Sequence, residues 1–133
     1  MSNKNMRDLG SFEDIIAQRK EATGGDGTTF AFPGFGRDWN IAAPGLQDEE
    51  WNERWADLHT DLRDGLVTLA QYREELADLT LGEQADDFLA ECRKAKLDAA
   101  QLIPAALDRF SEDAKANPTR QNSRSTRRRS KQR

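Results

Sequence analysis

The chain has 133 residues, of which 36% are hydrophobic and 33% charged, and its net charge at pH 7 is −4. A chain of this length forms a single domain with a modest core. No stretch approaches the roughly 18 consecutive apolar residues of a membrane span, and residues 1–5 lead into no apolar run, so we expect neither a transmembrane segment nor a secretory signal. One cysteine, Cys92, excludes an intramolecular disulfide and is typical of a reducing compartment.

The charge is divided unevenly along the chain. Residues 1–115 contain all 24 acidic residues and 13 of the 20 basic residues, which gives this part a net charge of −11. Residues 116–133 contain no acidic residue and a net charge of +7. The seven basic residues of this tail are Arg120, Arg124, Arg127, Arg128, Arg129, Lys131 and Arg133. The sequence therefore predicts an acidic folded body followed by a basic tail.

The N-terminal part begins with polar residues 1–10, which we expect to be flexible. Ser11 lies three residues before Asp14, a weak form of the capping box, and apolar residues follow at helical spacing. This pattern predicts a helix over residues 12–22. Three glycines within residues 24–27 then indicate a turn.

Residues 28–42 are the only part of the sequence with strand periodicity. Phe30 and Phe32 alternate in one run, and Trp39 and Ile41 alternate in a second. A turn over residues 33–36 connects the runs, so the pattern predicts a β-hairpin with one aromatic face. Because an isolated hairpin is marginally stable in water, this face must pack on helices or on another subunit.

Four helices with short connections are predicted after the hairpin. Acidic residues at 48–50 open the first, Thr68 with Gln71 caps the second, Thr80 with Glu83 caps the third, and Asp98 caps the fourth. The apolar stripes of the four helices are, in order, Trp51, Trp55, Leu58 and Leu62; Leu69, Tyr72, Leu76 and Leu79; Leu81, Ala85, Phe88, Leu89 and Cys92; and Leu102, Ile103, Ala106, Leu107 and Phe110.

Pro104 is placed about two turns inside the last of these helices, so we expect a kink or a later helix start. Residues 116–133 lack the apolar side chains needed to offset the entropy of ordering, and we expect them to be disordered. The fold class that results is mainly α: a helical domain over residues 11–115 with four to five short helices, an N-terminal β-hairpin over residues 28–42, and a disordered basic tail.

A search of the sequence for catalytic or metal-binding chemistry yields few candidates. His59, the one histidine, follows Leu58 in an amphipathic helix, and we interpret it as a partly covered surface residue. Cys92 continues an apolar stripe and is interpreted as a buried, unreactive thiol. One histidine and one cysteine do not provide the usual four zinc ligands. The glycines of residues 24–27 lack the lysine of a phosphate-binding loop. We therefore expect no enzymatic activity, no metal and no cofactor.

Aromatic side chains are the strongest candidates for protein contacts. Trp51 and Trp55 are spaced as core residues, yet tryptophan is enriched at interfaces, so core and interface both remain open. The candidate interaction surface consists of Phe30, Phe32, Phe35, Trp39, Trp51 and Trp55, and self-association through it is possible. The basic tail lacks aromatic residues, so its contacts with nucleic acid would be weak and independent of sequence.

The layout resembles the tail assembly chaperones of long-tailed phages that infect actinobacteria. Three segments carry the resemblance: the aromatic hairpin at residues 30–41 (FAFPGFGRDWNI), the segment at residues 79–88 (LTLGEQADDF), and the polar residues from 117 onward that lead into a Ser/Arg tract. They are similar to the F-x-F…G-x-x-W-x-I/L-P opening, the L-L-G-E-x-x-x-x-F turn and the polar ending of that family. Trp51, Trp55 and Pro104 are departures that the family pattern does not require.

The resemblance implies a function in the infected cell. Such proteins bind the tape measure protein, help recruit tail tube subunits to it in the host cytoplasm, and are absent from the finished virion. A programmed ribosomal frameshift near the end of the reading frame extends a minority of the product. The residues themselves leave one alternative open, a small nucleic-acid-associated protein that contacts DNA or RNA through its basic tail.

Overall fold

The structure, a computed structural model, describes residues 8–116 and confirms a mainly helical fold with one N-terminal β-hairpin. Residues 1–7 of the segment 1–10 that was predicted to be flexible lie outside the described residues. Residues 117–133 of the tail that was predicted to begin at residue 116 also lie outside them, whereas Ala116 itself is the last residue of the final helix. The elements are α1 (Phe12–Thr23), β1 (Thr29–Gly34), β2 (Arg37–Ala42), α2 (Glu49–Arg63), α3 (Leu69–Leu81), the 3₁₀ turn η1 (Gly82–Gln84), α4 (Ala85–Ala95) and α5 (Ala99–Ala116).

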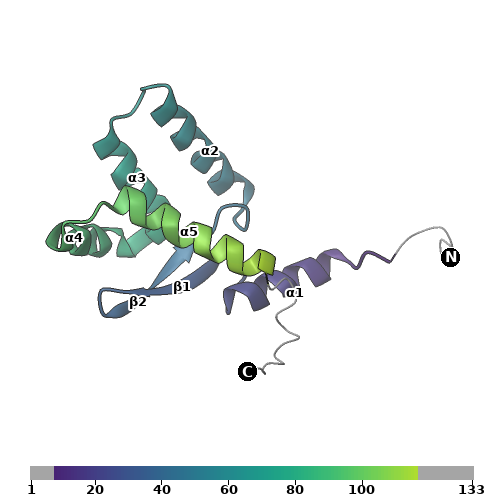
Figure 1. The fold of residues 1–133 in the computed structure, drawn as a ribbon. Coiled ribbons are helices and arrows are strands. Elements are labelled where there is room, and N and C mark those ends of the chain that lie inside the picture. Colours follow the sequence, from purple (N-terminus) through teal and green to yellow (C-terminus); the bar gives the residue numbers. More distant parts are fainter. Residues whose placement is uncertain (1–7, 117–133) are drawn as a thin grey trace.

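Helix α3 is the centre of the domain. It packs against α2, α4, α5 and strand β2, and Leu76 and Ala77 in its middle are completely buried. Figure 1 shows α2 antiparallel to α3, with α5 passing diagonally between this pair and the hairpin. The apolar stripe predicted for this helix is buried at Tyr72 and Leu79, whereas Leu69 in the first turn is exposed because it precedes the packed part of the helix.

The hairpin turn is shorter than predicted. Pro33 and Gly34 belong to β1 and pair with Asp38 and Arg37, so the connection is the two-residue turn Phe35–Gly36 instead of residues 33–36. Both turn residues have positive φ, +53° and +79°. Such a turn matches the right-handed twist of paired strands, which is why the ladder continues to the tip.

The predicted capping boxes have different outcomes. Ser11 with Asp14, and Thr68 with Gln71, form complete capping boxes at α1 and α3. The prediction at Thr80 is wrong, because this residue lies inside α3 and its hydroxyl donates to the Leu76 carbonyl at 2.8 Å. Burial of the last turn in the core extends α3 to Leu81, and α4 begins only after the 3₁₀ turn.

Helix α5 begins where the sequence predicts. Asp98 caps it by accepting a hydrogen bond from the Ala100 backbone N–H at 2.9 Å. Pro104 lies within the helix, so the later start is wrong. Proline removes one backbone donor, but buried Ile103 and Leu107 on either side hold this turn against the core.

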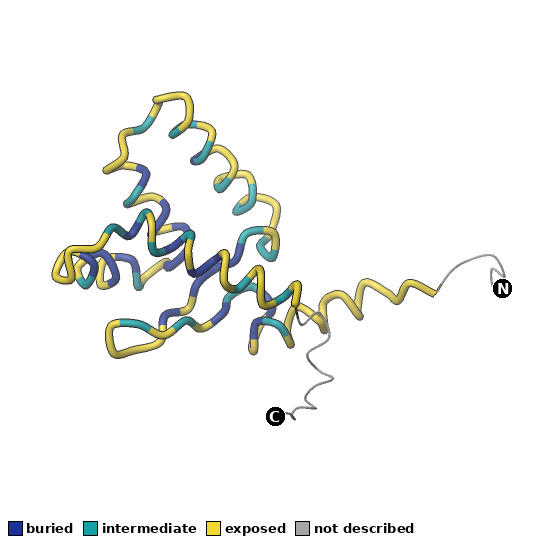
Figure 2. Tube along the Cα trace, in the orientation of Figure 1, coloured by how far each residue is buried: buried dark blue, intermediate teal, exposed yellow. Residues whose placement is uncertain are grey.

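The N-terminal helix differs from the others in its burial. Figure 2 shows α1 as an almost continuously exposed helix that extends away from the body, and Thr23 at its C-terminal end is its one buried residue. The Thr23 hydroxyl accepts a hydrogen bond from the Gly27 N–H at 3.0 Å and donates to the Arg19 carbonyl at 2.9 Å. The end of α1 is therefore attached to the body, while its first turns extend beyond it.

Candidate partner-binding surface

Four of the predicted surface residues belong to the hairpin, and the structure divides them. Phe30 and Trp39 are 5% and 2% exposed, so both are core residues, which corrects their assignment to an interaction surface. Phe30 stacks on Phe110 of α5 with a 4.3 Å separation of the rings, and helix α5 thereby covers this face of the hairpin. Phe32 is half-buried and Phe35 is 36% exposed, so only these two offer ring surface to a partner.

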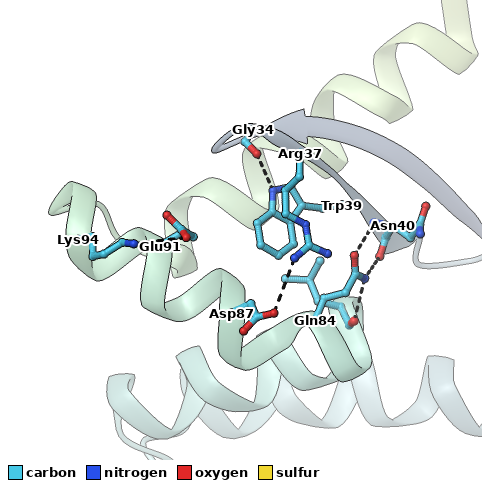
Figure 3. Close-up of polar contacts among 9 residues, drawn as sticks. Gly34, Arg37, Trp39, Asn40, Gln84, Asp87, Glu91 and Lys94 are labelled. Carbon is cyan, nitrogen blue, oxygen red and sulfur yellow. Dashed lines mark hydrogen bonds and ion pairs between the residues drawn. The ribbon is translucent and has the colours of Figure 1, made fainter.

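A network of polar contacts holds strand β2 against the start of α4 (Figure 3). The Trp39 Nε1–H donates to the Gly34 carbonyl at 2.9 Å, and the Arg37 guanidinium lies 4.0 Å above the Trp39 ring. Arg37 also approaches Asp87 of α4 at 3.7 Å. The indole is thus buried with its one donor satisfied and is fixed in place as structural support.

Trp51 and Trp55 form part of an aromatic row along α2. Their rings stack at 5.6 Å, and both are half-buried. Trp51 Nε1–H donates to the Leu79 carbonyl of α3 at 2.9 Å, whereas Trp55 is in contact with the ring of His59, 4.3 Å away. Trp51 is thus tied to α3, and Trp55 borders the groove described below.

His59 is held in a single arrangement by two partners. Its Nδ1 lies 2.8 Å from the Trp55 carbonyl, and its Nε2 lies 3.2 Å from the Tyr72 hydroxyl. A carbonyl can only accept, so Nδ1 carries a proton and donates to Trp55, while Nε2 and the Tyr72 hydroxyl share a hydrogen bond. Both ring nitrogens therefore make hydrogen bonds within the fold. These bonds constrain His59 more than the partly covered surface position that the sequence predicts.

Cys92 is 2% exposed, as the sequence predicts, and burial raises the pKa of its thiol. Among residues 8–116 no group of three or more histidine, cysteine, aspartate or glutamate side chains is arranged to hold a metal ion. None of the helices in that part of the chain is long and apolar enough to cross a membrane.

Four exposed large apolar side chains gather at the start of α1 and in the segment just before it, and sequence analysis did not assign them to a binding surface. Leu9 and Phe12 are 80% and 81% exposed, and Ile15 and Ile16 are 47% and 50% exposed. Their helical spacing was visible in the sequence, but that spacing normally indicates a buried face. We call these four residues the α1 apolar face.

A groove of 610 Å³ begins beside this face and runs along α5. One wall is α1, through Ile15, Gln18, Arg19 and Ala22, and the opposite wall is α2, through Trp55 and His59. Its remaining boundary residues come from the connection after β2 and from α5: Ala43, Pro44, Leu46, Pro104, Leu107, Asp108, Phe110, Ser111 and Ala114. Ile15 belongs to both the groove and the α1 apolar face, so the two form one continuous surface.

Residues 8–116 contain 24 acidic and 11 basic side chains, a net charge of −13. The basic residues predicted to contact polyanions, from Arg120 to Arg133, lie outside the described residues. Comparison of the chain with protein-family models, with curated proteins and with solved structures finds no match.

Proposed function

We propose that this protein is a tail assembly chaperone of a long-tailed phage, which binds apolar helical segments of the tape measure protein in the host cytoplasm and helps recruit tail tube subunits to it. The observation that carries the proposal is the α5 groove with the adjoining α1 apolar face. A tape measure protein exposes long apolar helical segments before the tube surrounds it, and a chaperone must cover such segments reversibly. The resemblance of the hairpin and of residues 79–88 to this family supports the same proposal.

The groove has the dimensions of a helix-binding site. Pro104 and Ala114 mark positions ten residues apart along the α5 wall, which corresponds to about 15 Å. A client helix of about ten residues would lie along this wall, with its apolar side toward Leu107 and Trp55. Amphipathic helices bind other proteins in this way, through apolar side chains on one face.

The charge of the body fits the same role. A net charge of −13 on residues 8–116 opposes indiscriminate aggregation, so a complex with an apolar client stays dispersed. The groove wall itself carries one charge of each sign, Arg19 on α1 and Asp108 on α5, so a client helix with both acidic and basic residues beside its apolar face would fit it.

The test is co-expression of this chain with the tape measure protein encoded beside it. We expect the tape measure protein to be recovered soluble and to co-purify with the full chain. Ala114→Glu places a carboxylate in the groove and should reduce the recovered complex at least about tenfold, which corresponds to about 1.4 kcal/mol.

Gln101→Glu is the matched control, because Gln101 is exposed on the same helix and lies outside the groove. This variant should behave as the wild type does. An insoluble tape measure protein in the presence of the wild-type chain would reject the chaperone proposal, and equal loss in both variants would reject the groove as the binding site.

The basic composition of residues 116–133 favours a second candidate function, non-specific binding of nucleic acid. Replacing Arg127, Arg128 and Arg129 with glutamine should abolish such binding in a filter assay at low salt, because the body itself repels polyanions. Retention of tape measure binding by the same variant would separate the two functions. A slippery heptamer with an overlapping frame in the corresponding coding sequence would further support the chaperone proposal.

A further inference from the structure

The α1 apolar face has no covering element within the described part of the chain. A helix of 12 residues is marginally stable in water unless its apolar side is packed, yet α1 carries both a capping box and a left-handed glycine cap at Gly24. These caps thus stabilise α1 although Phe12 and Ile16 are exposed to solvent. A stable α1 therefore requires a covering group from outside residues 8–116.

We propose that a second copy of this chain covers it, with the two α1 helices paired antiparallel about a two-fold axis. The shape of the molecule carries the first part of the argument. Figure 1 shows the body at the C-terminal end of α1 and the first turns of α1 extending away from it. Antiparallel pairing puts the two bodies at opposite ends of the helix pair, whereas parallel pairing would put both bodies at the same end, where they collide.

Charge supports the same orientation. Glu13 near the start of α1 and Lys20 near its end are seven residues apart, so they border the same edge of the apolar face. In an antiparallel pair, this edge of one helix lies beside the same edge of the other helix, and the two edges run in opposite directions. Each Glu13 therefore approaches the other copy's Lys20. In a parallel pair the same edges of the two copies lie on opposite sides of the interface, so neither Glu13 nor Lys20 would approach the other copy's Lys20 or Glu13. Arg19, seven residues after Phe12, lies on the face itself, where antiparallel pairing puts its guanidinium beside the other copy's Phe12 ring, and Glu21 lies about half a turn from the centre of the face.

The area of the face determines the strength of the dimer. Its four side chains leave roughly 400 to 500 Å² of apolar surface exposed per copy, so pairing removes at most roughly 800 to 1,000 Å² from water, which is at or below the lower bound for a specific interface. The dimer should therefore be weak, with a dissociation constant in the micromolar range. Ile15 borders both this interface and the groove, so a second copy and a client helix would compete for it. The dimer itself requires only the purified chain and does not depend on the proposed chaperone function.

Sedimentation velocity of the full chain over about 5 to 500 μM tests the proposal. The wild type should pass from monomer to dimer in this range. Phe12→Asp should raise the dissociation constant at least tenfold without harming the helix, because negative charge is favourable in a first helical turn. Ala17→Asp, on the opposite and exposed side of α1, is the control and should leave the dimer unchanged.

Charge reversal tests the orientation at low ionic strength. Glu13→Lys and Lys20→Glu should each weaken the dimer about threefold, and the double variant should restore it. A parallel pair would show no such pattern, because Glu13 of one copy and Lys20 of the other do not meet across a parallel interface. A wild type that stays monomeric at the highest concentration, a dimer unaffected by Phe12→Asp, or single reversals without effect would each overturn the proposal.

Discussion

The side chain of Gln84 pairs with the backbone of Asn40 as a neighbouring strand would. Its Oε1 accepts from the Asn40 N–H at 3.0 Å, and its Nε2 donates to the Asn40 carbonyl at 2.9 Å (Figure 3). The same Nε2 also donates to the Leu81 carbonyl at 3.0 Å, at the end of α3. One amide thus satisfies the free edge of β2 and ties it to the α3–α4 connection, 44 residues away in sequence.

Replacing Gln84 with alanine should therefore lower the free energy of unfolding by about 1 kcal/mol, since each hydrogen bond contributes modestly and water can replace part of the pairing. The control is Gln101→Ala on the exposed side of α5, where no side-chain hydrogen bond is present. Urea denaturation followed by circular dichroism measures both. Equal stabilities of the two variants would show that the amide pairing contributes nothing.

Two threonines that look alike in sequence should respond differently to aspartate. Thr68→Asp should stay within about 0.5 kcal/mol of the wild type, because aspartate also caps helices. Thr80→Asp should cost at least about 3 kcal/mol, because it puts an unpaired charge at a 2% exposed position. Thermal denaturation of both variants distinguishes the sites, and comparable melting temperatures would contradict the assignment of Thr80 to the interior of α3.

Stability should depend on pH through Asp98. This carboxylate accepts a hydrogen bond from Arg73 Nε at 2.9 Å, and that bond, followed by the one from the Ala100 N–H, lowers the Asp98 pKa below its ordinary value of 3.8. A lowered folded-state pKa contributes stability above the unfolded pKa that is lost as the pH falls through the folded pKa.

Asp98→Asn keeps the helix cap but loses the charge, so it should be less stable than the wild type at pH 7. The difference should begin to shrink near pH 3.8 and vanish at lower pH. Asp98→Ala loses cap and charge together and should cost about 1 to 2 kcal/mol at pH 7. Urea titrations at several pH values measure these differences. A gap between wild type and Asp98→Asn that widens on acidification would contradict the assignment.

The thiol of Cys92 should report on opening of the core. It is buried against α3 and α5, and desolvation raises its pKa, which disfavours the reactive thiolate. Labelling with an aromatic disulfide reagent should thus be at least about 100-fold slower in the native protein than in 6 M urea. Rapid labelling under native conditions would show that the packing around α4 opens easily.

Local sequence signals predicted most of the fold. The capping residues Ser11, Thr68 and Asp98 lie where three helices begin, because a cap bonds backbone groups within a few residues of itself. Thr80 shows the limit of this reasoning. It has the same local signature, but burial of its turn in the core decided that the helix continues, and burial depends on residues distant in the chain.

The candidate site was less predictable than the fold. Aromatic residues of the hairpin were obvious in sequence, but whether they are covered depends on α5, whose Phe110 stacks on Phe30 from 80 residues away. The α1 face was missed for the opposite reason. Helical spacing of Phe12 and Ile16 indicates that a face is apolar, and it carries no information about whether another element reaches that face.

What the sequence by itself determined about this protein is the kind and order of its elements: a capped helix, a hairpin with an aromatic face, four amphipathic helices, and an acidic body joined to a basic tail. These follow from periodicity, caps and charge, which act over a few residues. Only the tertiary structure decided that the hairpin aromatics Phe30 and Trp39 are core residues, that α1 extends with its apolar face uncovered, and that a groove lies along α5. Coverage of a surface depends on where non-adjacent elements pack, and no local pattern encodes it.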